Sequence, residues 1–253
     1  MSNVLISLSS FGSAQVRRHG RLWSAQLAAG CGADGVEVRG ELLQGGREEI
    51  FRIAAALPTL QRVYSSPEAV WSHDGKLDRV ALDRGLAAAQ AVAAPRLKMS
   101  IGHWRIDDAR SMATLRERVA DTPAAPLIEN DQTDAAGTLE HLTAFFDAAL
   151  AQGAVLGMAF DIGNWHWTGE GPVQAAAALA PRVRNVHCTG VQRQPQRWIA
   201  VPLAESVAPW RAVLRSMPGD QPWAIEYPLV GDDLPAVTRS ELARLRNAME
   251  GLA

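Results

Sequence analysis

The sequence contains little cysteine and has no excess of either charge. Only two of its 253 residues are cysteine, Cys31 and Cys188, which is too few for a disulfide framework or a thiolate zinc site. Lysine and arginine together number 25 against 27 aspartate and glutamate residues, which gives a formal net charge of −2. A protein without a basic excess attracts nucleic acid only weakly, so we expect a small polar ligand instead.

Long apolar runs and flexible linkers are also missing. Nowhere do about 18 apolar residues follow one another, and the N-terminal stretch lacks the charged leader and apolar segment of a signal peptide. We therefore expect a soluble, cytoplasmic protein that does not enter a membrane. No Pro/Gly/Ser-rich segment divides the chain, and 253 residues with 47% apolar content suffice for a single domain over residues 1–253.

Short β-like runs alternate with longer Ala/Leu/Arg-rich stretches, the pattern of strand-helix units on a parallel sheet. The predicted strands are 4–9, 35–39, 62–66, 97–101, 127–130, 157–162, 184–188 and 223–227. The predicted helices are 14–29, 46–56, 77–93, 107–119, 138–151, 173–179, 205–216 and 234–249. Such a series predicts an α/β fold with one (β/α)8 TIM barrel, which typically needs about 250 residues.

Four of the predicted strands end on a carboxylate or an imidazole, at Glu129, Asp161, His187 and Glu226. The carboxyl ends of parallel barrel strands share one rim, so these side chains are expected to converge. Each of them alone also fits a solvated loop position, but crowded carboxylates repel unless a cation or protons neutralise them. The set therefore predicts one divalent metal ion, with Mn²⁺ or Mg²⁺ favoured and Co²⁺ or Zn²⁺ as alternatives.

Strand alternation predicts which side chains face the barrel lumen. The apolar residues of strand 97–101 share one face, so Lys98 points to the other face, inward. The same parity predicts further inward side chains at Ser7, Glu37, Ser65, Glu129, Asp161, His187 and Glu226. A purely structural barrel fills its lumen with branched apolar side chains, so this polarity indicates a functional site.

The inward charged residues have more than one interpretation. Lys98 is suited either to a substrate carboxylate or leaving hydroxyl, or to an internal ion pair with Glu37 or Glu129. Glu37 itself either contacts substrate or braces the lumen. Arg39 shares the parity of Glu37, so it either binds an anionic ligand at the mouth or pairs with Glu41.

Aromatic and imidazole side chains follow several strand ends, at Trp71, His103, Trp104, Trp165, His166 and Trp167. Aromatic faces stack on the C–H surfaces of sugars and exclude water from a site. We predict substrate contacts for Trp104 and Trp165, with His103 and His166 beside them. Trp71 and Trp167 fit simple loop packing better.

Several strand motifs resemble those of the xylose isomerase-like barrel superfamily. They are GADGVEVR (32–39), LIEN (127–130), FDIGN (160–164), NVH (185–187) and AIEY (224–227). The most similar branch is the sugar isomerase and epimerase group, with ketose 3-epimerases, hydroxypyruvate isomerases and inosose dehydratases. The resemblance covers nearly the whole chain and implies the same four metal ligands.

The resemblance also implies a chemistry. A divalent ion would lower the cost of an enediolate, while Glu129 and Glu226 remove and return a proton next to the substrate carbonyl. It implies substrate contacts for Asn164, where many members have His, and for Arg193, which also fits an exposed loop arginine. The implied substrate is a small sugar or keto-sugar acid. Isomerisation, epimerisation and dehydration share this first step, and a non-catalytic sugar-binding barrel is a further alternative.

Some positions depart from the resembling epimerases. Ala135 stands where they have Glu, and Cys188-Thr189 replaces a usual Lys-Asp pair. The identity of the sugar is therefore left open. A three-zinc endonuclease on the same fold would need several more inward histidines than His187, so we exclude a nucleic-acid substrate. The resemblance is compatible with a homo-oligomer.

Overall fold

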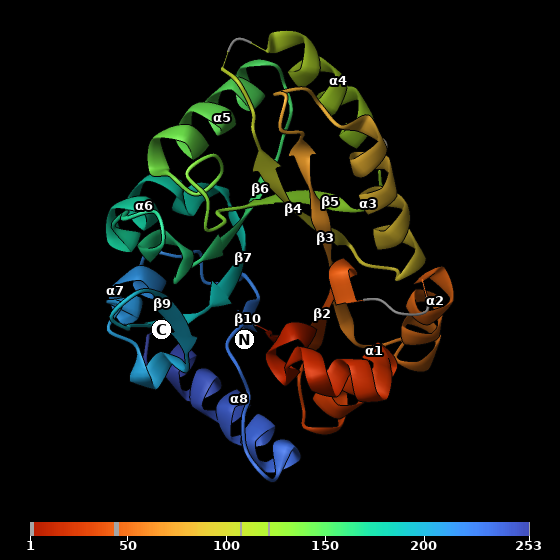
Figure 1. Cartoon of the computed structure of the whole chain (residues 1–253), viewed down its shortest axis with the longest axis vertical. Helices are drawn as coiled ribbons and strands as arrows, with labels where there is room; N and C mark the ends of the chain where they lie inside the picture. The colour runs from red at the N-terminus through yellow and green to blue at the C-terminus, as the bar shows by residue number, and fades with distance from the viewer. Residues whose placement is uncertain (1–2, 43–45, 107, 121, 253) are drawn as a thin grey trace.

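The strands form a closed parallel barrel in a computed structural model that describes residues 3–42, 46–106, 108–120 and 122–252. Within these residues, eight strands pair in the order β1-β10-β7-β6-β5-β4-β3-β2, and the helices surround them (Figure 1). The barrel strands are β1 (Val4–Ser7), β2 (Gly35–Arg39), β3 (Gln61–Trp71), β4 (Arg96–Gly102), β5 (Ala125–Glu129), β6 (Gly157–Asp161), β7 (Val183–Cys188) and β10 (Trp223–Ile225). The predicted (β/α)8 barrel is confirmed.

The helices follow the barrel strands in the predicted order. They are α1 (Ser13–Gly30), α2 (Gly46–Ala56), α3 (Arg79–Ala91), α4 (Ala109–Ala120), α5 (Leu139–Ala151), α6 (Pro172–Leu179), α7 (Trp210–Arg215) and α8 (Leu234–Glu250). Asp107, the predicted start of the fourth helix, lies outside the described residues. In the described part of the chain, no helix combines the length and apolar character that crossing a membrane requires.

The main hydrophobic core lies between the barrel and its helices. Outward strand residues such as Val36, Ile128 and Phe160 belong to it, as the alternation predicts. Inside the barrel, a small separate cluster of Leu5, Val63 and Ala224 fills the lower lumen. The inward positions above this cluster are polar, so the upper lumen is built as a site rather than as a core.

An antiparallel hairpin, β8 (Gly190–Arg193) and β9 (Trp198–Val201), extends from the barrel between β7 and α7 and was not predicted. Its turn is closed by Gln194 N–H donating to the Arg197 carbonyl over 2.9 Å. Two short runs around a polar, Pro-containing turn carry a hairpin signal. Our interpretation instead placed these residues in a loop before the seventh helix.

Three predicted elements differ from the observed ones for local reasons. Strand β3 continues through Pro67, beyond the predicted end at residue 66. The pairing with β4 shifts register between Ser65 and Ala69, so it needs no proline N–H there. Helix α1 is interrupted at Gly20, whose φ is 81°. Helix α7 is shorter than predicted, because Pro209 precedes its first turn.

Gly102 pairs with Trp71 in the last pair between β3 and β4, where there is no room for a side chain. Its φ is 68°, and an added Cβ would lie 2.1 Å from the Trp71 carbonyl oxygen. We expect Gly102→Ala to lower the free energy of unfolding by about 2–5 kcal/mol, because it combines backbone strain with a clash. Thermal unfolding measures this. The control Gly30→Ala adds a Cβ with nothing within 4 Å, so a similar loss there would contradict the explanation.

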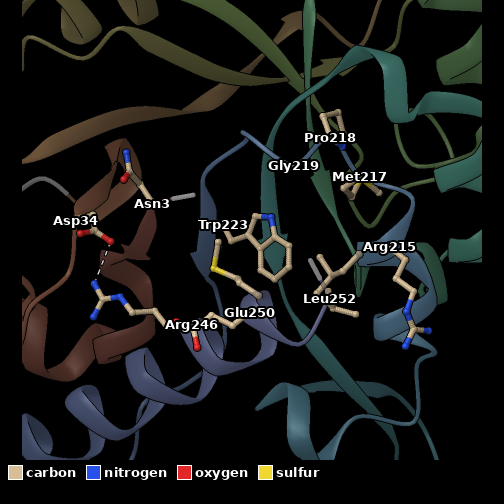
Figure 2. Close-up of a pocket in the computed structure, with 12 residues that line it drawn as sticks. Asn3, Asp34, Arg215, Met217, Pro218, Gly219, Trp223, Arg246, Glu250 and Leu252 are labelled. Carbon is tan, nitrogen blue, oxygen red and sulfur yellow. Dashed lines mark hydrogen bonds and ion pairs between the residues drawn. The ribbon is translucent and has the colours of Figure 1, made fainter. Parts of the chain in front are cut away.

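A cavity of about 370 Å³ opens at the N-terminal ends of the strands. Figure 2 shows the Trp223 ring at its centre, between the Asp34–Arg246 pair on one side and Arg215 on the other. The ion pair joins Arg246 Nη2 to Asp34 Oδ2 over 3.0 Å. Because this cavity lies at the end of the barrel opposite Glu129, it is separate from the site described next.

Candidate metal centre

Four neighbouring strands bring Glu129, Asp161, His187 and Glu226 together. Glu129 and Asp161 are the last residues of β5 and β6, His187 lies one residue before the end of β7, and Glu226 follows β10 directly. The register pairs Asp161 with His187 across β6 and β7. One ligand atom from each of the four residues lies within 4.8 Å of the others. The predicted convergence at the C-terminal rim is confirmed.

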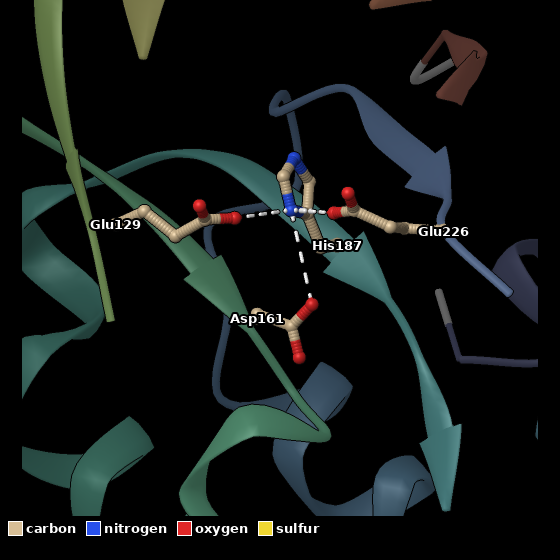
Figure 3. Close-up of side chains that lie close together, drawn as sticks. All are labelled: Glu129, Asp161, His187 and Glu226. Atoms are coloured by element: carbon tan, nitrogen blue, oxygen red, sulfur yellow. Dashed lines mark ion pairs between the residues drawn. The ribbon is translucent and has the colours of Figure 1, made fainter. Parts of the chain in front are cut away.

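The donor set suits a divalent cation. Figure 3 shows three carboxylates pointing at one nitrogen of His187. This nitrogen, Nδ1, lies 2.8 Å from Glu129 Oε1 and contacts Glu226. Neither His187 Nδ1 nor Glu226 Oε2 makes a hydrogen bond of acceptable geometry, although both atoms are buried. Buried polar atoms that converge without such bonds fit an ion as their common partner, and three oxygens with one nitrogen suit Mg²⁺ or Mn²⁺.

Asp161 is held rigidly by its neighbours. Its Oδ1 accepts hydrogen bonds from the backbone N–H groups of Gly163 (2.7 Å) and Asn164 (2.8 Å). Its Oδ2 accepts a hydrogen bond from Thr189 Oγ1 over 2.7 Å. These bonds fix the carboxylate orientation before any ligand arrives, as expected of groups that support a metal ligand.

Two cations hold the remaining carboxylates. Lys98, which is 1% exposed, places Nζ 2.7 Å from Glu129 Oε1 and 3.0 Å from Glu37 Oε1. Arg39 binds Glu226 through Nη1 and Glu41 through Nε, the latter over 2.7 Å. Of the predicted alternatives for Lys98, the internal ion pair is therefore observed. For Arg39 the predicted pair with Glu41 is present, together with a contact to Glu226.

The site carries an excess of negative charge. The carboxylates of Glu37, Glu129 and Glu226 face the cations of Lys98 and Arg39, and Asp161 lies beside His187. Arg39 also pairs with Glu41. With a neutral imidazole, five carboxylates and two cations leave three negative charges. A divalent cation would offset most of this excess, which is a second reason why the residues fit such an ion.

Opposite charges keep three of the carboxylates ionised. Burial opposes ionisation of Glu37, but His187 and Lys98 outweigh it and lower its pKa to about 2. The pKa of Glu129 is also lowered against burial, chiefly by Lys98. The pKa of Glu226 falls well below its usual range, because His187, Lys98 and Arg39 act together against burial. Both rim glutamates are therefore present as bases.

The other two candidate ligands favour protons when no ion is bound. Burial, followed by the charge of Glu226, raises the pKa of Asp161 to about 7. Burial acts to lower the pKa of His187, but Glu226 and Glu37 outweigh it and raise that pKa well above its usual value. Protons therefore supply part of the positive charge that an ion would bring.

The predicted substrate residues on the β6 and β7 loops lie in different surroundings. The Asn164 side chain donates to the Asn130 carbonyl over 2.9 Å and accepts from Gln132 over 3.0 Å, so both ends of its amide are engaged within the protein. Arg193 is exposed on the hairpin, with its guanidinium 5.2 Å from the centre of the Trp198 ring.

His166 joins the hairpin to the loop after β6. Its Nδ1 lies 3.1 Å from the Gly163 carbonyl oxygen and therefore carries the proton, which leaves Nε2 as an acceptor. Burial lowers the pKa of His166. Its ring packs at 5.0 Å against Trp198. Arg193, Trp198 and His166 thus form a contiguous group on the rim.

The rim residues after β4 fall into two classes. His103 is exposed and packs at 4.3 Å against His73. Trp104 is only 3% exposed and packs edge-on against Phe145, with 5.3 Å between ring centres. In this structure Trp104 belongs to the packing under α5.

Trp165 is likewise part of the core. It is fully buried and lies 5.4 Å from Phe160, an outward residue of β6. The chain turns back against the outer face of the barrel directly after β6, through a 3-10 helix over Asn164–His166. Both rings are buried against apolar surface in this structure, and the substrate contacts of Trp104 and Trp165 stay a prediction.

Sequence reasoning missed several residues that support the site. Thr189 holds Asp161, and Ser7 Oγ donates a longer bond of 3.4 Å to Glu226 Oε1. Asn130 makes a reciprocal pair of hydrogen bonds with the Asp161 backbone. Ser7 was predicted to point inward, but its partner was not. The signal for Thr189 was its place two residues after His187, which strand alternation puts on the same face.

Comparisons with known proteins identify the fold. No protein-family model matches the chain, and no curated protein matches it at the sequence level. Among solved structures, a probable 3-DHS dehydratase involved in petrobactin synthesis from Bacillus anthracis matches with a TM-score of 0.70 at 16% identity, over 98% of this chain and 99% of that one. An L-ribulose 3-epimerase matches with a TM-score of 0.68 at 13% identity, over 100% and 96% of the two chains.

A further match has a bound sugar. A D-allulose 3-epimerase from Methylomonas sp., in complex with D-allulose, has a TM-score of 0.70 at 13% identity, over 98% of this chain and 97% of that one. A xylose isomerase domain-containing protein from Salmonella typhimurium matches with a TM-score of 0.72 at 13% identity, over 98% and 97%. At these identities the likeness shows the fold alone, a TIM barrel like that of these solved structures, one of which is described as a xylose isomerase domain-containing protein.

Proposed function

We propose that this protein is a divalent-metal-dependent isomerase or epimerase of a small sugar or keto-sugar acid, which moves a proton at the carbon next to the carbonyl. The observation that carries the proposal is the placement of Glu129 and Glu226. Their carboxylates approach His187 Nδ1 from opposite sides (Figure 3). A substrate carbon held between them would have one carboxylate on each face.

The protein would contribute position and basicity. When bound, a divalent cation supplies Lewis-acid polarisation of the substrate carbonyl. Lys98 and Arg39 hold the two glutamates in place and keep them ionised. One glutamate would then accept the proton. The other, which is ionised in the resting protein, would first take a proton from water and would then return it to the substrate carbon from the opposite face. The hydrogen bonds to Asp161 would keep its carboxylate in a fixed orientation during these steps.

The charge distribution bears on the substrate class. An anionic sugar acid requires a cation that is free to pair with its carboxylate. Lys98 and Arg39 are both committed to protein carboxylates, and Arg193 at the rim is the remaining predicted candidate. A neutral keto-sugar therefore fits the inner site better than a sugar acid, with the keto-sugar acid as the alternative that Arg193 supports.

A sugar dehydratase is the second candidate. It would use the same proton removal and then lose a β-hydroxyl as water, and one of the structural matches is a probable dehydratase. Lys98, which could protonate a leaving hydroxyl, is buried among carboxylates. That placement favours the isomerase or epimerase over the dehydratase.

Proton exchange from solvent tests the proposal directly. We expect the Mn²⁺- or Mg²⁺-loaded protein to introduce deuterium from D₂O next to the carbonyl of at least one substrate in a panel of neutral ketoses, keto-sugar acids and inososes. The exchange is read by NMR after removal of the metal, and the mass of the product separates isomerisation from loss of water. The metal-free protein is the control. Absence of exchange across the panel by the loaded protein would favour a non-catalytic sugar-binding barrel.

A further inference from the structure

Glu37 occupies an unusual position for a residue predicted to contact substrate. Its side chain is 0% exposed, so no bound molecule reaches it without rearrangement. Oε2 lies 2.8 Å from His187 Nε2. Oε1 pairs with the charge of Lys98 Nζ over 3.0 Å, without a hydrogen bond of acceptable geometry. Glu37 therefore meets the candidate metal centre only through other side chains.

The contact between Glu37 and His187 crosses the lumen. Strand β2 carries Glu37 and strand β7 carries His187, and these strands are separated by β1 and β10 in the barrel order. No backbone pairing links the two strands, so the ring orientation of His187 is set from the far side of the barrel. Both side chains are fully buried, and a hydrogen bond between polar groups is stronger in such a low-dielectric interior than in water.

The contact decides which nitrogen of His187 is available. A neutral imidazole carries one proton, and an ionised carboxylate can only accept a hydrogen bond. When an ion takes the place of the second proton, the remaining proton is therefore on Nε2, facing Glu37, and the lone pair of Nδ1 is available to the ion. Nδ1 is the atom that lies among the other candidate ligands, 2.8 Å from Glu129 Oε1 and 3.8 Å from Asp161 Oδ2.

We propose that Glu37 is a positioning residue, which holds His187 with its proton on Nε2 so that the Nδ1 lone pair binds the ion, and that Lys98 orients Glu37 for this role. The inference rests on the proposed function, since it requires a divalent ion among the four ligands. It replaces the predicted role of Glu37 as a substrate contact. Such outer partners of metal-binding histidines typically change metal affinity by about 10–100-fold when they are removed.

Lys98 makes the proposal sharply testable. In the Glu37→Gln variant only one end of the side chain can accept a hydrogen bond, whereas in the wild-type protein one oxygen of Glu37 faces Lys98 Nζ and the other faces His187 Nε2–H. If the amide oxygen faces Lys98, the amide N–H₂ faces Nε2 and favours a proton on Nδ1, which blocks metal binding. Removing the ammonium group with Lys98→Met frees the amide oxygen for Nε2–H and should restore the tautomer.

The experiment is a double-mutant cycle in metal affinity. Isothermal titration with Mn²⁺ is carried out on the wild-type protein, on Glu37→Gln, on Lys98→Met and on the double variant. We expect Glu37→Gln to raise the Kd about 10–100-fold in the wild-type background and clearly less in the Lys98→Met background. Glu41→Gln is the matched control, because it removes a carboxylate that binds Arg39 but does not contact His187. We expect its Kd to stay within about threefold of wild type.

A second measurement does not depend on any variant folding correctly. ¹⁵N NMR of the imidazole in the Zn²⁺-loaded wild-type protein reports which nitrogen is protonated, and we expect Nε2–H with Nδ1 bound to the ion. A proton on Nδ1 overturns the inference. So does an unchanged Kd in Glu37→Gln, or an equal loss in Glu41→Gln. Wild-type protein that binds no divalent ion overturns the proposed function together with this inference, whereas the other results leave the proposed function intact.

Discussion

Replacing either rim glutamate by glutamine, Glu129→Gln or Glu226→Gln, is expected to reduce turnover by about 10³-fold. An amide cannot accept the proton that leaves the substrate carbon, and positioned acid-base groups typically contribute about 10²–10⁴-fold to rate. Each substitution keeps the length of the side chain and an oxygen that can still bind an ion. The rate is measured by deuterium exchange and by product formation at saturating Mn²⁺, so that weaker metal binding does not mimic lost chemistry.

The two variants should not be equivalent. If each carboxylate acts on one face of the substrate carbon, each variant should lose deuterium exchange more severely for one epimer of the substrate than for the other. Glu117→Gln is the control, since Glu117 is an exposed residue of α4 that pairs only weakly, at 3.6 Å, with Arg116. Full exchange of both epimers by either rim variant would contradict the assignment of this glutamate as an acid-base group.

The barrel and its four-residue centre were readable from the sequence because both follow from local patterns. Alternation along a strand fixes which face a residue occupies, and closure of the barrel brings the strand ends to one rim. Glu129, Asp161, His187 and Glu226 needed no further information to converge. Lys98 was placed inward by its apolar neighbours, and the structure confirms this.

The partners across the lumen were not readable, because they depend on which strands face one another after closure. Alternation puts Glu37 and His187 inside the barrel, but only the three-dimensional structure shows that the Glu37 carboxylate meets Nε2 of His187. The same holds for Arg39 and Glu226. Long-range pairs of this kind carry no periodic signal in a single sequence.

The surroundings of the loop aromatics could not be read from the sequence for a related reason. Trp104 and Trp165 follow strand ends, which suggested a place at the mouth of the barrel. Their loops turn back within a few residues, and the rings fill gaps against Phe145 and Phe160. Burying a large aromatic ring in an adjacent core is strongly favourable. Tertiary packing therefore decides where these rings lie, and their position directly after a strand does not.

Metal affinity should fall steeply as the pH is lowered through about 7. In the protein without an ion, the pKa of Asp161 is raised to about 7, and that of His187 is raised well above its usual value. At pH 6 both groups therefore carry protons, which must leave before the Asp161 carboxylate and His187 Nδ1 can bind an ion. We expect affinity to decrease by at least about tenfold for each pH unit below 7, because protons compete directly for the ligand atoms.

The number of protons released on Mn²⁺ binding tests this prediction directly. Calorimetry of Mn²⁺ binding in buffers of different ionisation enthalpy should show protons released at pH 6, and fewer from Asp161→Asn, which has lost one of the titrating groups. The thermal stabilisation by Mn²⁺ should be larger at pH 8 than at pH 6, because it grows with the ratio of ion concentration to Kd. Binding that is equally tight at pH 6 and pH 8 and releases no proton would show that Asp161 and His187 are not ligands, since the ion would then bind without displacing the protons that their raised pKa values hold.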